Sequence, residues 1–176
     1  MLQTILILIF TLIVVPIVSY NYGTPLNEIQ ETLLFESSMI ALAVSLYCFV
    51  VGEITRNVSQ TDKLWSIVPA VYAWYITLHS GMNERMVLMS VLVTIWAVRL
   101  SLNFARRGGF SLKFWEGEED YRWEVLRQRP GFNNKFVWLL FNLFFICLYQ
   151  QGLIYMFTVP ILAGLADTAP ALFWAD

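Results

Sequence analysis

The hydrophobic positions of this chain fall into long runs that contain no charged residue. Such runs cover residues 1–27, 37–52, 64–83, 86–98 and 136–166. A helix that crosses a bilayer needs about 20 mostly apolar residues, and each run can hold most or all of one. The pattern therefore predicts five membrane-spanning helices, at about residues 2–20, 34–53, 64–80, 86–105 and 136–160.

Composition supports a membrane protein over a soluble one. A soluble all-α fold would need polar positions at helical spacing along these runs, and they are missing. Hydrophobic residues make up 58% of the chain and charged residues 14%, with a mean hydropathy of +0.61. We predict one all-α integral membrane domain over residues 1–176, in contact with the lipid bilayer. The first run also suggests a signal peptide, but it lacks a basic n-region and is long for an h-region, so a retained helix fits better.

Lysine and arginine concentrate in the loops that five spans would place on one side. These loop cations are Arg56, Lys63, Arg106, Arg107, Lys113, Arg122, Arg127, Arg129 and Lys135, whereas Arg85 alone lies on the other side. The positive-inside rule then places the N-terminus inside and the C-terminus outside. The sequon at Asn57 would lie inside and carry no glycan. The endoplasmic reticulum and the mitochondrial inner membrane both fit this multi-pass protein.

The most charged segment, GEEDYRWEVLRQRPGF, lies within the interfacial segment 106–135. Acidic residues come first and basic residues last, before Pro130 and Gly131, which predicts a short helix at the inner surface with a Glu118–Arg122 pair. Its interfacial anchors would be Trp115, Tyr121 and Trp123. An alternative stays open: a basic rim that accepts an anionic group such as a cofactor phosphate. That rim would comprise Arg106, Arg107, Arg122, Arg127 and Arg129.

Charged residues near the inner ends of the spans suggest a structural ionic cluster. Its members would be Glu53, Asp62, Lys63 and Arg99, with Arg56 close by. Arg99 shares a helical face with Trp96 and Asn103, which favours an inward polar seam, although snorkelling to the interface explains the arginine equally well. Asp62 also has a simpler explanation, because it stands at capping-box spacing from Ser59.

A polar stripe on the third span offers the remaining candidates for chemistry. Tyr72, Tyr75 and His79 follow helical spacing and would line a cavity or pack against neighbouring helices. Cys48 and Cys147 fall inside predicted spans as small buried hydrophobes. With one histidine and no cysteine cluster, the sequence predicts no metal site. A net charge of −2 gives no indication of nucleic acid.

Four blocks resemble the N-terminal half of an uncharacterised branch of the steroid 5α-reductase superfamily, which is distantly related to isoprenylcysteine carboxyl methyltransferases. They are QTDKLW, VTIWAVRLSLNFARRGGF, FWEGEEDYRWEVLRQRPGF and FNLFFICLYQ. The resemblance implies a membrane bundle with a lipid-like substrate and NADPH bound from the cytosolic side, as in oxidoreductases acting on CH–CH groups. Tyr72 or Tyr75 would polarise a substrate ketone, and Glu53 is a further weak catalytic candidate.

The chain departs from that superfamily in one respect. The Arg-His-Pro-Asn cofactor signature is missing, since the only histidine, His79, precedes Ser80. We therefore expect no cofactor on this chain alone. The sequence favours a non-catalytic structural or accessory subunit that packs among other membrane subunits. The alternative is an NADPH-dependent reductase of a lipid or steroid enone, completed by a C-terminal half on another chain.

Overall fold

The computed structural model describes residues 2–113 and 115–165, and every regular element in these ranges is helical. The first helix comprises α1 (Leu2–Ile9), a π-helical turn η1 (Phe10–Val14) and α2 (Val15–Tyr22). The middle of the chain forms α3 (Glu28–Thr55), α4 (Gln60–Trp65), α5 (Val68–His79) and α6 (Glu84–Ala105). The last part forms α7 (Tyr121–Arg127), α8 (Lys135–Phe141), the π-helix η2 (Asn142–Tyr149), α9 (Gln150–Thr158) and the 3₁₀ segment η3 (Val159–Leu165). The all-α prediction is thus confirmed for the described residues.

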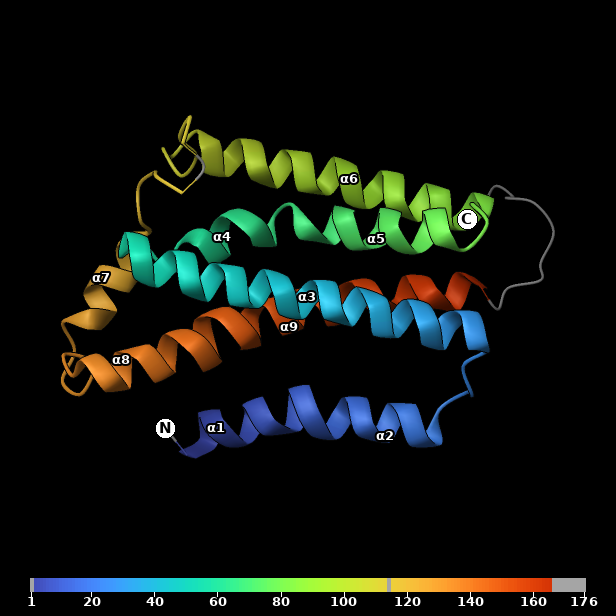
Figure 1. Ribbon diagram of the computed structural model, residues 1–176, viewed down its shortest axis with the longest axis horizontal. Coiled ribbons are helices and arrows are strands. Elements are labelled where there is room, and N and C mark those ends of the chain that lie inside the picture. Colours follow the sequence, from blue (N-terminus) through green and yellow to red (C-terminus); the bar gives the residue numbers. More distant parts are fainter. Residues whose placement is uncertain (1, 114, 166–176) are drawn as a thin grey trace.

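The long helices run side by side along one axis and alternate in direction (Figure 1). The end of α3, the end of α6 and the start of α8 gather at one end of the bundle, together with α7. We call this the α7 end. α6 packs along α5, while α9 contacts α3, α4 and α5. α5 is therefore in contact with both α6 and α9.

Three helices are long and apolar enough to cross a membrane: Glu28–Thr55, Glu84–Ala105 and Lys135–Leu165. They correspond to the second, fourth and fifth predicted spans and indicate a multi-pass membrane protein. The first predicted span is helical, but its apolar stretch, Leu6–Tyr22, is shorter. The third predicted span, 64–80, is divided between α4 and α5, since Pro69 occupies the first turn of α5, where a missing N–H costs least.

Side-chain caps fix the starts of the long helices. Asn27 and Gln30 form a capping box, so α3 begins six residues before the predicted span at 34. Asn83 caps α6, and Asn134 caps α8 by accepting from Phe136 and Val137. Asn27 and Asn83 are the last residues of uncharged runs, and Asn134 lies between two runs. The caps therefore shift the ends of the predicted helices but not their order.

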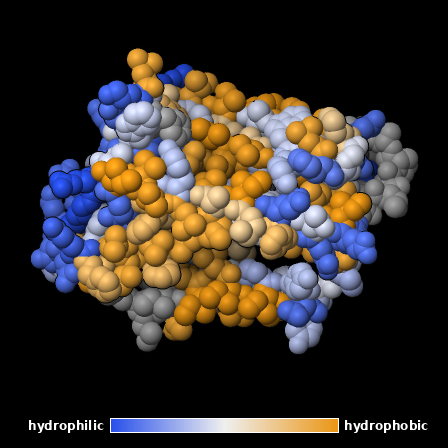
Figure 2. All heavy atoms as spheres, in the orientation of Figure 1, coloured by the Kyte–Doolittle hydropathy of each residue, from blue (hydrophilic) through white to orange (hydrophobic). Residues whose placement is uncertain are grey.

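Much of the hydrophobic surface faces outward. Figure 2 shows it over the middle of the bundle, with hydrophilic surface concentrated at the α7 end and in a smaller area at the opposite end. Large apolar side chains such as Phe35, Ile54 and Ile95 are exposed. They belong to neither of the buried clusters around Ile76 and Tyr72. A bilayer would cover such a surface, whereas water would not stabilise it.

Candidate functional site

α4 is a short polar helix buried at the α7 end of the bundle. Gln60, Thr61, Asp62 and Lys63 are each at most 3% exposed. The loop that follows α6 folds over them and supplies backbone acceptors. The Gln60 amide donates to the Trp115 carbonyl at 2.8 Å, and the Lys63 ammonium donates to the Glu116 carbonyl at 2.5 Å. The charged loop is therefore a lid on α4.

Asp62 joins α4 to α7. Its Oδ2 accepts from the Ser59 hydroxyl at 2.7 Å and from Trp123 Nε1 at 2.8 Å. Ser59 Oγ in turn accepts from the Asp120 N–H at 2.9 Å.

Two sequence predictions are corrected at this junction. Ser59 makes no side-chain cap hydrogen bond to α4; its hydroxyl bonds Asp62 and Asp120 instead, because the loop brings these partners within reach. Trp123 is only 7% exposed, so it is a packing and hydrogen-bonding residue rather than an interfacial anchor.

α7 confirms the short helix predicted in the charged segment, with Asp120 as its cap. Arg122 pairs with Asp120 at 2.7 Å rather than with Glu118, because the capping carboxylate already lies beside the guanidinium. This pairing holds the pKa of Asp120 below its ordinary value. Arg122 also reaches Asp62 at 3.9 Å. Its side chain therefore stands between the loop surface and the buried carboxylate.

A hollow of about 550 Å³ lies between α6 and α9, beside the Asp62 junction. We call it the α6–α9 hollow. It is lined by Asp62, Trp65, Trp96, Arg122, Trp123, Phe145, Gln150, Leu153, Ile154 and Phe157. Trp96 of α6 and Phe157 of α9 approach each other across it, with ring centroids 6.2 Å apart. Its volume falls within the range of about 300 to 1,000 Å³ typical of ligand sites.

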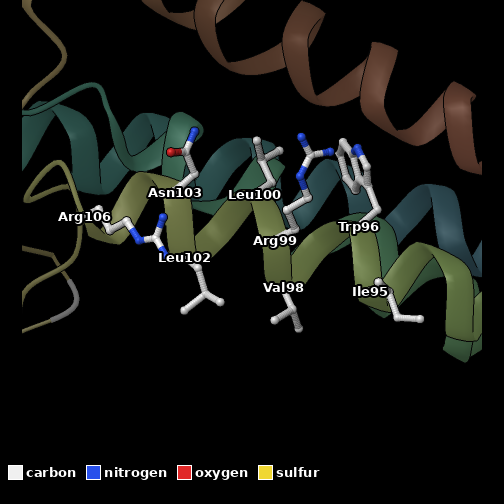
Figure 3. Close-up of a pocket in the computed structure, with 8 residues that line it drawn as sticks. All are labelled: Ile95, Trp96, Val98, Arg99, Leu100, Leu102, Asn103 and Arg106. Carbon is white, nitrogen blue, oxygen red and sulfur yellow. The ribbon is translucent and has the colours of Figure 1, made fainter.

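A separate groove along α6 is shown in Figure 3, where Trp96, Arg99 and Asn103 point to one side and Val98 and Leu102 to the other. The three residues share one face as predicted, but Arg99 is exposed there, so the expected inward polar seam is not formed. The same three residues line this groove along the α7 half of α6, together with Arg106. Arg99 is exposed in this groove, as expected for an arginine that snorkels.

The predicted ionic cluster is not held together by ion pairs among the described residues. Glu53 Oε1 accepts from the Asn142 amide at 2.6 Å, whereas Asp62 faces Trp123 and Arg122. Arg99 forms no ion pair within residues 2–113 and 115–165. α7 supplies the partners of Asp62, so the expected cluster with Arg99 is replaced by contacts with Trp123 and Arg122.

The three weak catalytic candidates lie apart from the hollow. Tyr72 is fully buried and packs edge-on against Tyr155, with ring centroids 5.5 Å apart. The Tyr75 hydroxyl donates to Glu36 at 2.9 Å, and the His79 ring lies against Tyr75. Packing therefore accounts for this stripe in the structure, and Glu53 faces a different part of the α7 end.

The five arginines of the predicted rim occupy separate places. Arg107 and Arg122 line one small hollow of about 120 Å³ with Asp62 and Asp120. Arg106 lies in the α6 groove, and Arg129 is exposed. Arg127 makes two hydrogen bonds to Glu119, at 2.6 and 2.7 Å. Their role in binding a cofactor stays a prediction.

Sequence reasoning missed the buried polar contacts made by the π-helix η2. Cys147 lies five positions after Asn142, and its thiol donates to Asn142 Oδ1 at 3.4 Å. The Thr61 hydroxyl approaches the same sulfur at 3.7 Å. An α-helix would turn these two positions apart, whereas a π-helix stacks residues five apart. Among the described residues, no three His, Cys, Asp or Glu side chains are grouped to hold a metal.

Comparisons with known proteins place residues 48–176 in a family described as "Protein of unknown function (DUF1295)". An uncharacterised protein of Schizosaccharomyces pombe is 32% identical over 126 residues, which covers 65% of this chain and 35% of the yeast protein. The chain thus spans about a third of the length of this relative. No solved structure matches significantly.

Proposed function

This chain belongs to the DUF1295 family, and on that premise we propose that it is a multi-pass membrane module that binds an elongated amphiphile in the α6–α9 hollow. A lipid or a steroid-like molecule has the required form. The module would serve as a non-catalytic part of a larger membrane assembly.

The distribution of polarity in the hollow carries this proposal. Toward α9 its walls are Leu153, Ile154 and Phe157, whereas at the α7 end they are Asp62 and Arg122. An amphiphile would place its apolar body against the first group and its polar end beside the charged pair. Trp96 and Phe157 are partly open to the surface, at 37% and 66% exposure. A ligand can therefore enter sideways from the bilayer.

We further propose that the first helix and the α4–α5 segment also cross the membrane, which gives five passes with the N-terminus inside. The alternating helix directions support this topology (Figure 1). The loop cations Arg56, Lys113 and Lys135 then lie at the α7 end, on the cytoplasmic or matrix side, as the positive-inside rule requires.

The reductase interpretation remains a second proposal, for the assembly rather than for this chain. Arg107 and Arg122 line a hollow that shares Asp62 and Trp65 with the α6–α9 hollow. NADPH held by another segment or chain could approach the amphiphile there. The 120 Å³ available is far below the size of a dinucleotide site, so the additional protein would have to supply the nicotinamide pocket.

Blocking the hollow tests the proposal. Leu153 lines it, and Leu153→Trp would fill part of the space. Leu46→Trp makes the same change on an exposed face of α3 that lines none of the described hollows. We expect native mass spectrometry of detergent-purified protein to find a co-purified amphiphile, and Leu153→Trp to reduce its occupancy about tenfold while Leu46→Trp retains it. Equal occupancy in both variants would place the ligand elsewhere.

A further inference from the structure

A second hollow lies at the α7 end, where α3 ends and α8 begins. It has a volume of about 830 Å³. Arg56, Arg127 and Lys135 contribute positive charge, Glu53 contributes one carboxylate, and Phe136 and Trp138 form part of the apolar wall. We call it the α3–α8 hollow. It shares no lining residue with the α6–α9 hollow.

Two of its cations have no acidic partner in the part of the chain that the structure describes. Arg127 is neutralised by Glu119 and held over the Trp138 ring, 4.8 Å from the ring centroid. In contrast, Arg56 and Lys135 are exposed and form no ion pair with any residue in 2–113 or 115–165. With Glu53 as the one carboxylate in its lining, the hollow still presents a net positive charge, in a chain whose net charge is −2.

Arg56 occupies a backbone position that favours glycine. It ends α3 with φ 56° and ψ 32°, the left-handed conformation, and its N–H donates to the Gly52 carbonyl. Helices that end this way usually have glycine there, because a side chain costs about 1 kcal/mol or more. A cation suits a helix C-terminus, but any exposed residue nearby could supply it. The strained arginine is explained better by a ligand for its guanidinium.

The apolar wall continues from these charges along α8. Phe136 is 66% exposed, and Leu139 lies one turn further on. An acyl chain can lie against this strip while a phosphate meets Arg56 and Lys135. Basic pockets between helices at a membrane surface bind anionic lipid head groups in this way. We propose that the α3–α8 hollow binds the phosphate group of an anionic phospholipid from the leaflet at the α7 end.

Arg56→Gly separates this role from folding, because glycine relieves the left-handed backbone while removing the guanidinium. We expect Arg56→Gly, purified as the full chain, to unfold at the same or a higher temperature. Its affinity for dioleoylphosphatidylglycerol, measured by native mass spectrometry, should fall about tenfold, as for one lost charge-assisted contact. The control Arg129→Gln removes an exposed cation that lines none of the described hollows and should retain the affinity. Arg56→Lys should restore most of it.

Three results would overturn the assignment. One is an equal loss in Arg56→Gly and Arg129→Gln, which would mean diffuse surface charge. Another is equal affinity of the parent for dioleoylphosphatidylcholine, which carries no net charge. The third is displacement of phosphatidylglycerol by millimolar inorganic phosphate, because a site that also grips an acyl chain should prefer the lipid strongly. None of these outcomes depends on the α6–α9 hollow.

Discussion

At the scale of single residues, Asp62 shows why a buried carboxylate persists in this membrane protein. Its side chain is 5% exposed, and the Arg122 charge stands at 3.9 Å, too far for a hydrogen bond. The close partners are the neutral donors of Ser59 and Trp123, both bonded to Oδ2. Asp62 therefore acts mainly as a double acceptor that fastens α7 to α4.

This role predicts different effects for two substitutions. Asp62→Ala leaves two buried donors without a partner, at about 1 to 3 kcal/mol each. Asp62→Asn still offers one carbonyl oxygen in the place of Oδ2. We expect Asp62→Ala to lower the free energy of unfolding in detergent by about 2 to 6 kcal/mol, and Asp62→Asn by less than half as much. Chemical denaturation followed by tryptophan fluorescence measures both. Equal losses would show that the ionic contact with Arg122 dominates.

At the scale of elements, the loop after α6 depends on close backbone contacts at glycine. Gly117 has φ 128°, and a Cβ there would lie 2.5 Å from the Gly109 carbonyl oxygen. Next to it, the Glu118 N–H donates to the Gly108 carbonyl at 3.1 Å. A side chain at Gly117 would push the loop segments around residues 108–109 and 117–118 apart. The loop would then no longer cover α4.

Gly131 provides a matched control, because its φ is also positive, at 95°, but a Cβ there would meet nothing within 4 Å. We expect Gly117→Ala to accelerate tryptic cleavage at Lys113 and Arg122 several-fold. Gly131→Ala carries only the backbone cost of about 1 to 2 kcal/mol and should cleave near the parental rate. If the two variants are cleaved alike, the Gly109 contact does not hold the loop.

The sequence predicts the order of the helices better than it predicts the contacts within the candidate site. Uncharged runs and asparagine caps such as Asn134 specify the order of the helices, because burial in lipid requires long apolar stretches. Asp62 and Arg122 were recognisable as candidates from their charge. Their partners were not, since Trp123 Nε1 reaches Asp62 only through tertiary packing. The π-helix η2 also does not follow the α-helical repeat of 3.6 residues per turn. The contact of Asn142 with Cys147 could therefore not be predicted from helical spacing.

At the scale of the whole molecule, the proposed topology predicts which exposed residues lie on each side of the membrane. Leu112 and Val125 are exposed near the α7 end, and Tyr22 and Met82 are exposed at the ends of helices on the other side. The native Cys48 and Cys147 are buried and should react slowly. In sealed, oriented vesicles, a membrane-impermeant maleimide should label cysteines at 112 and 125 from one side and at 22 and 82 from the other. Labelling of 22 together with 125 would contradict five passes.

The central claim is that an amphiphile lies in the α6–α9 hollow with its polar end toward α7. Photo-crosslinking with two forms of one fatty amphiphile, carrying a diazirine at either the head or the tail, tests position and orientation together. Peptide mapping should place the head-group crosslinks on α4 and α7, around Asp62 and Trp123, and the tail crosslinks on α9, around Leu153 and Phe157. Crosslinks spread evenly over exposed α3 and α6 surfaces, or the same peptides for both probes, would contradict the account.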